Sequence, residues 1–298
     1  MVYVQKVKTD IPGSRLLAYW DFGDIPIMGR TAAECPFCRG HIMGDRPGRN
    51  CTTTYTCGAS PFLSALQSTF PSELAVHDIT NGLPGQMVES YPGLAKYVWN
   101  NRSASILSQF LGSWLTDHGF DGLYMDGYLE PDLVKLQQCT TKEEGCTSFM
   151  KSGHKYDIDG DGAADSAATV AGSYFAWGPA FVSLMRAKLG DQAVLLANSA
   201  GSISDPSLSG VTIEMEGCVG SRGGVSKCAN ALNGQHTSTV ATGREPLSVL
   251  WLTHAESMSP AEQCAHVAAL QRQYPWVQAG TDFFDGSHIV CGSHLSQR

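Results

Sequence analysis

The segment Gly119-Phe-Asp-Gly-Leu-Tyr-Met-Asp126 indicates the fold class, because it is a short apolar run that follows a helix-like segment and ends on a carboxylate. Similar apolar runs recur along the chain, and most precede a segment with apolar residues at three- and four-residue spacing. The runs are 2–7, 16–20, 74–77, 122–125, 193–197, 211–214, 247–252 and 276–279, and the helix-like segments are 91–117, 171–189 and 260–274. Strands that alternate with helices predict a parallel sheet covered on both faces.

Eight strands close a (β/α)8 barrel of the TIM type, and this is the predicted architecture. The first unit fits poorly, because only about ten residues, Pro12 and Gly13 among them, separate the first two runs. That unit is therefore abbreviated, or the barrel lacks a piece. Gly190 is a predicted helix end, and Ser259-Pro260 is a predicted helix start.

We expect one domain over residues 1–298 that carries two long loops. One is a cysteine-rich insertion at about 25–60 and the other is an Asp-rich loop at about 127–168, and both are too long for plain connectors. Long structured loops in such folds usually shape a site.

Composition excludes several classes of protein. The chain has 298 residues with 43% hydrophobic and 16% charged side chains, which is enough for a large core and excludes a disordered chain or a coiled coil. The net charge is −8 and no lysine- or arginine-rich run is present, so nucleic acid is not an expected partner. No apolar stretch approaches the length of a membrane helix, and residues 1–10 lack the apolar centre of a signal peptide. We expect a monomer with no membrane partner and no targeting segment in this chain.

The ten cysteines favour an exported protein, because oxidising compartments let cysteines pair. Cys139 with Cys146, and Cys218 with Cys228, are the most favoured disulfides, since each pair closes a short loop. The alternative is a zinc or dithiol site at Cys35-Pro-Phe-Cys38, where Cys51, Cys57 and His41 are close in sequence. The disulfide interpretation predicts loops stapled by cystines and a secreted or extracellular location.

Polar and aromatic side chains lie at or near the ends of the predicted strands, which is where a barrel of this type holds its reacting groups. Flat aromatic faces stack on sugar rings, and carboxylates and amides bond to sugar hydroxyls. The predicted partner is therefore a poly- or oligosaccharide. The predicted substrate-binding residues are Tyr19, Trp20, Asp21, Asp78, Tyr128, Asn198, Trp251, His254 and Asp282.

Two carboxylates that converge on a cleft are the minimum for glycoside hydrolysis. Asp126 and Glu214 are the natural pair, because they end nonadjacent strands of the series. Glu216 shares a strand face with Glu214, so the second acid is one of these two. Acids at strand ends also cap helices or bind loop amides, and that alternative stays open for each of them.

Three segments in order resemble a loose group of glycoside-hydrolase-like barrels that includes the endo-α-1,4-polygalactosaminidase family and the hypothetical glycosyl hydrolases near it. The stretch 119–126 resembles their fourth strand, AVLLANSAG at 193–201 their fifth, and SGVTIE at 209–214 their sixth. The resemblance covers about residues 16–282 and implies catalytic positions for Asp126 and Glu214, with Asn198 beside the substrate. The chain departs from the group in its cysteine-rich insertion, its first unit and Glu216.

The segment Asp157-Ile-Asp-Gly-Asp-Gly-Ala-Ala-Asp165 has the spacing of a calcium-binding loop. Position twelve of that pattern is Ala168 instead of glutamate, so a regulatory EF-hand is not expected. The alternatives are a structural Ca²⁺ site and a solvated Asp-rich turn. The predicted metal ligands are Asp157, Asp159, Asp161 and Asp165.

The leading hypothesis is a secreted glycoside hydrolase that needs no cofactor for catalysis. The second is a catalytically silent barrel that binds carbohydrate, because a fold does not guarantee activity. The third is metal-dependent hydrolysis, which has suitable side chains but no recognisable ligand spacing. Its candidate ligands are His77, Asp78, His254 and Asp282.

Overall fold

The computed structural model describes residues 2–21, 24–26, 75–83, 86–87, 89–91, 94–128, 154–198, 204–214, 233–244, 246–251, 265, 268, 272 and 277–280. The chain forms two compact units, each assembled from segments far apart in sequence. The first unit comprises residues 1–20, 115–130 and 189–298, and the second comprises 21–114 and 131–188. All ten cysteines and most of the 25–60 insertion lie outside the described residues.

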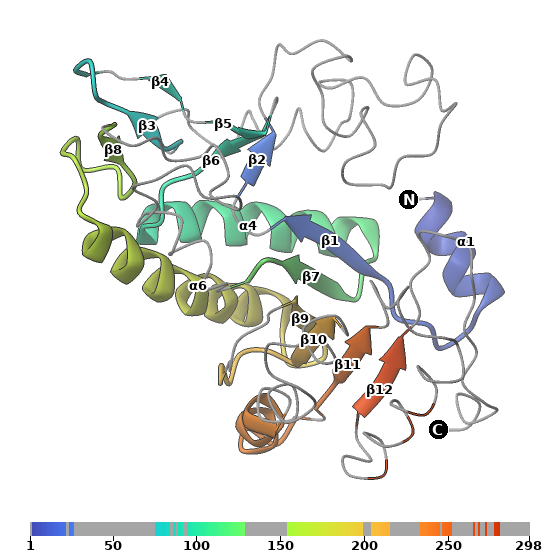
Figure 1. The fold of residues 1–298 in the computed structure, drawn as a ribbon. Coiled ribbons are helices and arrows are strands. Elements are labelled where there is room, and N and C mark those ends of the chain that lie inside the picture. Colours follow the sequence, from blue (N-terminus) through green and yellow to red (C-terminus); the bar gives the residue numbers. More distant parts are fainter. Residues whose placement is uncertain are drawn as a thin grey trace. The chain divides into compact units, whose positions relative to one another are not determined.

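The first unit contains a mixed α/β architecture built on a largely parallel sheet (Figure 1). Its strand order is β1-β7-β9-β10-β11-β12, and the pairings from β7 through β12 are all parallel. The order in space follows the order in sequence, as the repeated strand–helix pattern predicts. The strands are β1 (Leu17–Asp21), β7 (Gly122–Asp126), β9 (Val194–Asn198), β10 (Gly210–Glu214), β11 (Ser248–Trp251) and β12 (Val277–Gly280). The mixed α/β class is therefore confirmed.

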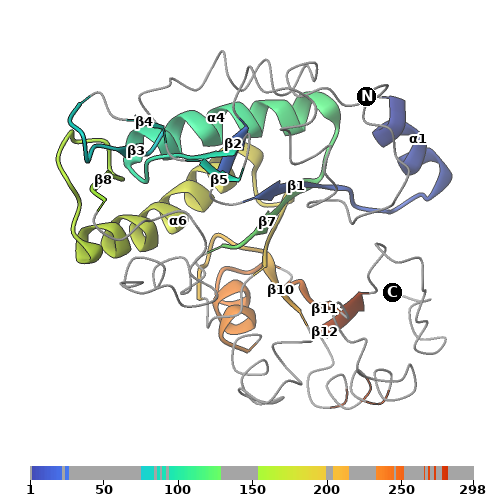
Figure 2. The ribbon, with the colours of Figure 1, turned by 45° about the horizontal axis from the view of Figure 1, so that its top comes forward.

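Close approach between neighbouring strands explains why β7 begins with glycine. A Cβ atom at Gly122 would lie 1.8 Å from the backbone oxygen of Val194, on the strand beside it. Beyond this contact, apolar side chains of the two strands pack together, and Tyr124, Val194 and Leu196 form a buried cluster. Figure 2 shows strands β10, β11 and β12 continuing the same sheet.

The predicted first strand at 2–7 is wrong, because these residues lie in helix α1 (Val2–Asp10). Val4 is buried, and Lys8, one helical turn later, bonds to Asp121 with a distance of 2.8 Å between Nζ and Oδ1. Contacts at positions i and i+4 suit a helix, and here they outweigh the strand-like alternation of valines.

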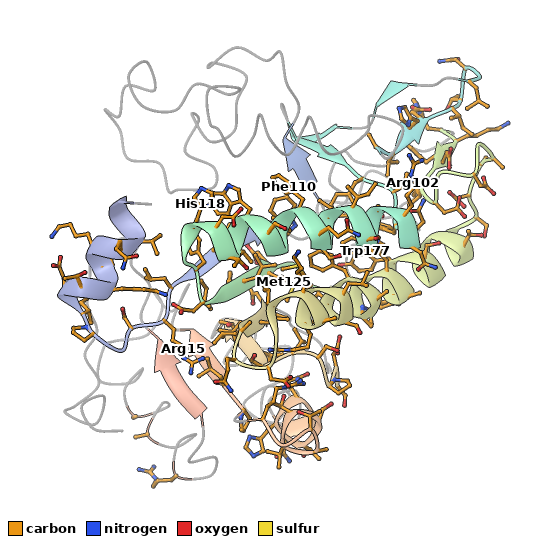
Figure 3. The ribbon with its side chains drawn as sticks, turned by 180° about the vertical axis from the view of Figure 1, so that it is seen from behind. Arg15, Arg102, Phe110, His118, Met125 and Trp177 are labelled. Atoms are coloured by element: carbon orange, nitrogen blue, oxygen red, sulfur yellow. The ribbon has the colours of Figure 1, made fainter. Side chains whose placement is uncertain are left out.

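Two long helices dominate the second unit, α4 (Asn101–His118) and α6 (Ala167–Leu189). They confirm the helices predicted at 91–117 and 171–189, except that residues 91–100 precede α4 and are not helical where they are described. Trp177 of α6 lies between the helices and donates from Nε1 to Ser103 Oγ of α4 over 2.8 Å (Figure 3). Helix α6 ends directly before Gly190, as predicted.

Among its described residues, the second unit also contains two small antiparallel sheets. The predicted strand at 74–77 contributes to one of them instead of the parallel sheet, since β3 pairs antiparallel with β4 and β8. The other sheet includes Tyr91 and residues 94–96, within the segment where a helix was predicted. The strands are β2 (Asp24–Pro26), β3 (His77–Asp78), β4 (Gln86–Met87), β5 (Glu89–Tyr91), β6 (Leu94–Lys96) and β8 (Tyr156–Asp157).

Within the described parts of the chain, no helix has both the length and the apolar character that crossing a membrane requires.

Candidate active site

Asp126 and Asn198 meet where two neighbouring parallel strands end. Met125 of β7 is in register with Ala197 of β9, so the residues that follow them are also adjacent. The amide Nδ2 of Asn198 donates to Asp126 Oδ1 over 2.9 Å. Asn198 is buried and Asp126 is partly exposed, so the amide supports the carboxylate from the inner side. Two of the predicted site residues, Asp126 and Asn198, are thus direct neighbours at one edge of the sheet.

Tyr19 of β1, which lies beside β7 in the sheet, contacts the same carboxylate. Its hydroxyl donates to Asp126 Oδ2 over 2.5 Å. Its ring stacks on that of Tyr124, with 5.8 Å between the centroids and 29° between the planes. Half of Tyr19 is exposed, against 9% of Tyr124, so Tyr19 brings an aromatic face to the surface at this strand end.

A turn at Gly127 and two hydrogen bonds of Asn198 hold the backbone around Asp126. Gly127 has φ 69°, a left-handed conformation that glycine adopts without strain, and it turns the chain at the end of β7. The backbone N–H of the next residue, Tyr128, donates to the carbonyl oxygen of Asn198 over 3.2 Å. Because Asn198 also bonds to Asp126 through its side chain, the turn and the carboxylate are held by the same residue.

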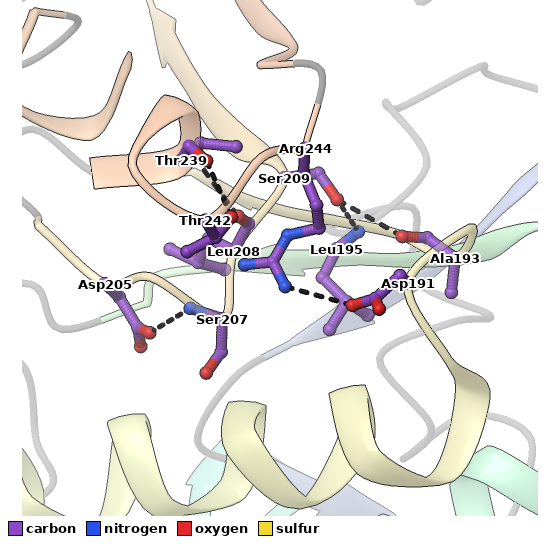
Figure 4. Close-up of polar contacts among 10 residues, drawn as sticks. All are labelled: Asp191, Ala193, Leu195, Asp205, Ser207, Leu208, Ser209, Thr239, Thr242 and Arg244. Atoms are coloured by element: carbon purple, nitrogen blue, oxygen red, sulfur yellow. Dashed lines mark hydrogen bonds and ion pairs between the residues drawn. The ribbon is translucent and has the colours of Figure 1, made fainter. Parts of the chain in front are cut away.

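Tyr128 is anchored in turn by a buried aspartate. Its ring is fully buried, and its hydroxyl donates to Asp205 Oδ2 over 2.8 Å. Asp205 Oδ1 accepts from the backbone N–H of Ser207, and the main chain of Asp205 exchanges two hydrogen bonds with the amide of Gln235 (Figure 4 shows the Asp205–Ser207 bond). These contacts hold the backbone and side chain of Asp205 in place. Neither Asp205 nor Gln235 was predicted from the sequence.

Glu214 and Trp251, two further predicted residues of this strand edge, are placed by their backbone alone. Thr212 of β10 is in register with Asn198, and Glu214 is in register with Trp251 of β11. Glu214 therefore ends its strand at the same edge of the sheet as Asp126, two positions beyond Thr212. The side chains of Asp21, Glu214 and Trp251 lie outside the described residues, as do Glu216, His254 and Asp282 entirely.

Trp20 is a further predicted binding residue, and it is 6% exposed. Among the predicted aromatic residues whose side chains the structure describes, Tyr19 is thus the one with a substantial exposed surface. A sugar-binding role for Trp20 or Tyr128 stays a prediction.

Asp78 belongs to the second unit, where it pairs with a histidine that the sequence did not single out. His154 Nδ1 lies 2.5 Å from Asp78 Oδ2, and Thr80 donates to Asp78 Oδ1 from both its hydroxyl and its backbone N–H. Burial acts to raise the pKa of Asp78, but these hydrogen bonds and the nearby imidazole outweigh it and hold the pKa below its ordinary value. His77, in register with Asp157, does not join this group.

The Asp-rich loop brings three of its four predicted ligands together. One carboxylate oxygen from each of Asp157, Asp159 and Asp165 lies within 4.8 Å of the others. Asp161 is outside this group and accepts a hydrogen bond from the backbone N–H of Ala163. Burial raises the pKa of Asp165, and the charges of Asp159 and Asp157 add to the increase against two backbone hydrogen bonds.

Backbone N–H groups also satisfy these carboxylates. Asp157 accepts from Gly160 and Gly162 over 2.8 and 3.0 Å, and Asp165 accepts from Ile158 over 2.5 Å. The loop thus keeps its carboxylates close together with its own main chain, and three oxygen ligands of this kind suit a hard cation such as Ca²⁺.

A pocket of about 350 Å³ adjoins this loop. Its aromatic residues are almost fully buried, because Trp99 packs on Tyr174 and Trp177 on Phe181. Its polar residues come from the start of α4, from the Asp-rich loop and from α6. The lining consists of Trp99, Asn100, Asn101, Asp159, Gly160, Asp161, Ser173, Ala176 and Trp177.

Comparison of the sequence with protein-family models finds no match, and comparison with curated proteins finds no significant similarity.

Proposed function

We propose that this protein is a secreted glycoside hydrolase that cleaves a poly- or oligosaccharide with two carboxyl groups, one of which is Asp126. The observation that carries the proposal is the placement of Asp126. It is a partly exposed carboxylate at the carboxyl edge of a parallel sheet, held by an amide and by a half-exposed tyrosine.

The chemistry needs a second carboxyl group opposite the first. One group donates a proton to the departing oxygen as the glycosidic C–O bond breaks, and the other attacks the anomeric carbon or takes a proton from the attacking water. The sum is the addition of one water, whose hydroxyl ends on the anomeric carbon and whose remaining proton ends on the leaving oxygen. Glu214 and Glu216 are the proposed second acids.

The sheet supports this assignment through its order and register. Strands in sequential order with parallel pairing suit a (β/α)8 barrel, whose reacting groups lie at the carboxyl ends of the strands. Glu214 ends β10, which is separated from β7 by one strand, β9. The resemblance of three strand segments to the polygalactosaminidase-like barrels agrees with the proposal and remains a prediction.

The same proposal includes the remaining expectations for the chain. Disulfides staple its loops, it works as a monomer outside the cell, and a structural Ca²⁺ sits at the Asp-rich loop, with no cofactor in the reaction itself. The grouping of Asp157, Asp159 and Asp165 favours the calcium site over a plain solvated turn.

The test is hydrolysis of a panel of neutral, acidic and amino-sugar polysaccharides, followed by release of reducing ends. Asp126→Asn should lose on the order of 10³-fold or more in kcat, because the amide keeps the shape of the side chain and removes its proton chemistry. Glu214→Gln and Glu216→Gln identify the second acid as the variant with the comparable loss. Asp117→Asn, at an exposed position on α4, is the matched control and should retain full activity.

Two results would overturn the proposal. Full activity of Asp126→Asn would remove this residue from the reaction. Binding of a polysaccharide without any hydrolysis by the wild-type protein would favour the silent carbohydrate-binding barrel instead.

A further inference from the structure

The carboxylate of Asp126 accepts a hydrogen bond at each of its two oxygens. Asn198 Nδ2 donates to Oδ1 over 2.9 Å, and the Tyr19 hydroxyl donates to Oδ2 over 2.5 Å. Both donors come from neighbouring strands of the same sheet, so the carboxylate is oriented by the fold and not by a loop. Each oxygen keeps one further lone pair, and the residue is partly exposed.

We propose that Tyr19 is a positioning residue, whose hydroxyl, together with the Asn198 amide, holds Asp126 as a hydrogen-bond acceptor and thereby makes it the nucleophile or base of the reaction. This rests on the proposed glycoside hydrolase function. The proton donor is then the other carboxyl group, for which Glu214 and Glu216 are the candidates.

The geometry disfavours Asp126 as the proton donor. A proton on Oδ1 would face the NH₂ group of Asn198, which offers only donors. A proton on Oδ2 would require the Tyr19 hydroxyl to rotate and accept a hydrogen bond from Asp126. The phenol proton would then no longer bond to the carboxylate. A nucleophile or base must be a carboxylate that accepts hydrogen bonds at both oxygens, since one of its lone pairs must reach the anomeric carbon or a water proton.

Stacking holds the Tyr19 hydroxyl in place. The ring lies over the buried ring of Tyr124, which belongs to the same strand as Asp126 and precedes it by two residues. The phenol therefore approaches Asp126 from a fixed direction even though half of Tyr19 is exposed. The sequence prediction gave Tyr19 a sugar-stacking role, and that role depends on the ring, whereas the positioning role depends on the hydroxyl.

A spectroscopic experiment tests the contact without any substrate. Protein labelled with ¹³C at tyrosine Cζ gives one resonance for Tyr19, identified by its absence in Tyr19→Phe. Asp126→Asn should move this resonance more than those of tyrosines in the second unit, such as Tyr174, because the phenol loses its charged acceptor. An unchanged Tyr19 resonance in a folded Asp126→Asn variant would overturn the proposal.

Kinetics on the polysaccharide that the wild type cleaves separate the two roles of Tyr19. Tyr19→Phe keeps the ring, so a positioning role predicts a loss on the order of tenfold or more in kcat with KM changed less than about twofold. A raised KM with an unchanged kcat would overturn the positioning role. Tyr174→Phe, a buried tyrosine of the second unit, is the control and should match the wild type.

Azide decides the chemical role of Asp126. In Asp126→Ala, azide occupies the vacated space and attacks the anomeric carbon, so it should restore activity and give a glycosyl azide with the anomeric configuration opposite to that of the substrate. A glycosyl azide of retained configuration would make Asp126 the acid and overturn the proposal. If the wild type cleaves no polysaccharide, the proposed function fails, while the tyrosine resonance still decides whether Tyr19 holds Asp126.

Discussion

Gly122 lies where the parallel sheet leaves no room for a side chain, and a substitution there gives a sharp stability prediction. A Cβ atom at this position would meet the oxygen, carbon and nitrogen atoms of the Val194 backbone at 1.8 to 2.8 Å. Backbone atoms inside a sheet cannot move aside as a flexible side chain can. Gly122→Ala should therefore lower the free energy of unfolding by about 3 kcal/mol or more, measured by urea denaturation.

Gly172 provides the matched control for this substitution. It lies in helix α6, and a Cβ atom there would meet nothing within 4 Å. Gly172→Ala should be neutral or stabilise the protein by about 0.4–1 kcal/mol, because alanine favours the helix. Equal stability of the two variants would contradict the strand pairing of β7 with β9.

Asp121, the residue before β7, links helix α1 to the sheet. Burial acts to raise the pKa of Asp121, but hydrogen bonds from Lys8 and from the backbone N–H of Leu16 outweigh it, so the pKa lies below its ordinary value. A carboxyl group with a lowered pKa in the folded state contributes stability above its unfolded pKa. That stability is lost as the pH falls through the folded pKa.

The resulting prediction concerns acid unfolding. The wild type should lose part of its stability below about pH 4, the ordinary range of an aspartate, and Asp121→Asn should be less stable at neutral pH with a weaker acid dependence. Urea denaturation at pH 7 and at pH 3 measures both. Asp10→Asn, at the exposed end of α1, is the comparison, and an equal acid dependence in Asp121→Asn and the wild type would contradict the role of Asp121.

The Asp-rich loop is an element whose stability should respond to calcium. If the loop holds the proposed Ca²⁺, the ion should neutralise the repulsion among Asp157, Asp159 and Asp165 and add about 2.7 kcal/mol to the stability at a hundred times its Kd. Chelation should therefore lower the Tm by several degrees. Asp165→Asn should abolish the difference, whereas Asp161→Asn should retain most of it, because Asp161 lies outside the group. A Tm that changes with neither Ca²⁺ nor chelator would contradict the calcium site and favour a solvated Asp-rich turn.

The parallel strands were predictable from sequence because each is a continuous apolar run that ends on a polar residue. The predictions failed where tertiary contacts override local pattern. The valine alternation at 2–7 reads as a strand, but Val4 and Lys8 share a face in α1 and contact the rest of the first unit. A helix was predicted to begin at residue 91, but β5 and β6 precede α4 there. In the sequence, Pro92-Gly93 lies between these two strands, and this dipeptide favours a turn over a helix.

In the candidate site, too, some contacts were predictable from the sequence and others were not. Asp126 and Asn198 were predictable neighbours, since the ends of parallel strands share an edge. The bond from Tyr19 to Asp126 was not predictable, because it depends on β1 lying beside β7 although the two are far apart in sequence. His154 was also missed, since its partner Asp78 is distant in the chain and no spacing rule joins them.

At the scale of the whole molecule, the ten cysteines give a prediction about disulfides and about the compartment in which the protein works. Titration of free thiols in denatured, unreduced protein should find few or none, and peptide mapping should join Cys139 to Cys146 and Cys218 to Cys228. Reduction should then lower the stability, by roughly 2–5 kcal/mol for each bridge lost. Finding most thiols free would contradict both the bridges and a location outside the cell.

The interleaved order of the two units also has a consequence for synthesis on the ribosome. The second unit is complete in sequence at residue 188, whereas the first unit gains strands β9 to β12 only from residue 194 onward. The second unit can therefore fold first. At that point β7 has been made, but β9, which later pairs with it, has not. An unpaired strand edge of this kind invites association with other chains. From residue 126 until β9 is made at residue 194, the nascent chain therefore carries β7 with one edge that has no partner.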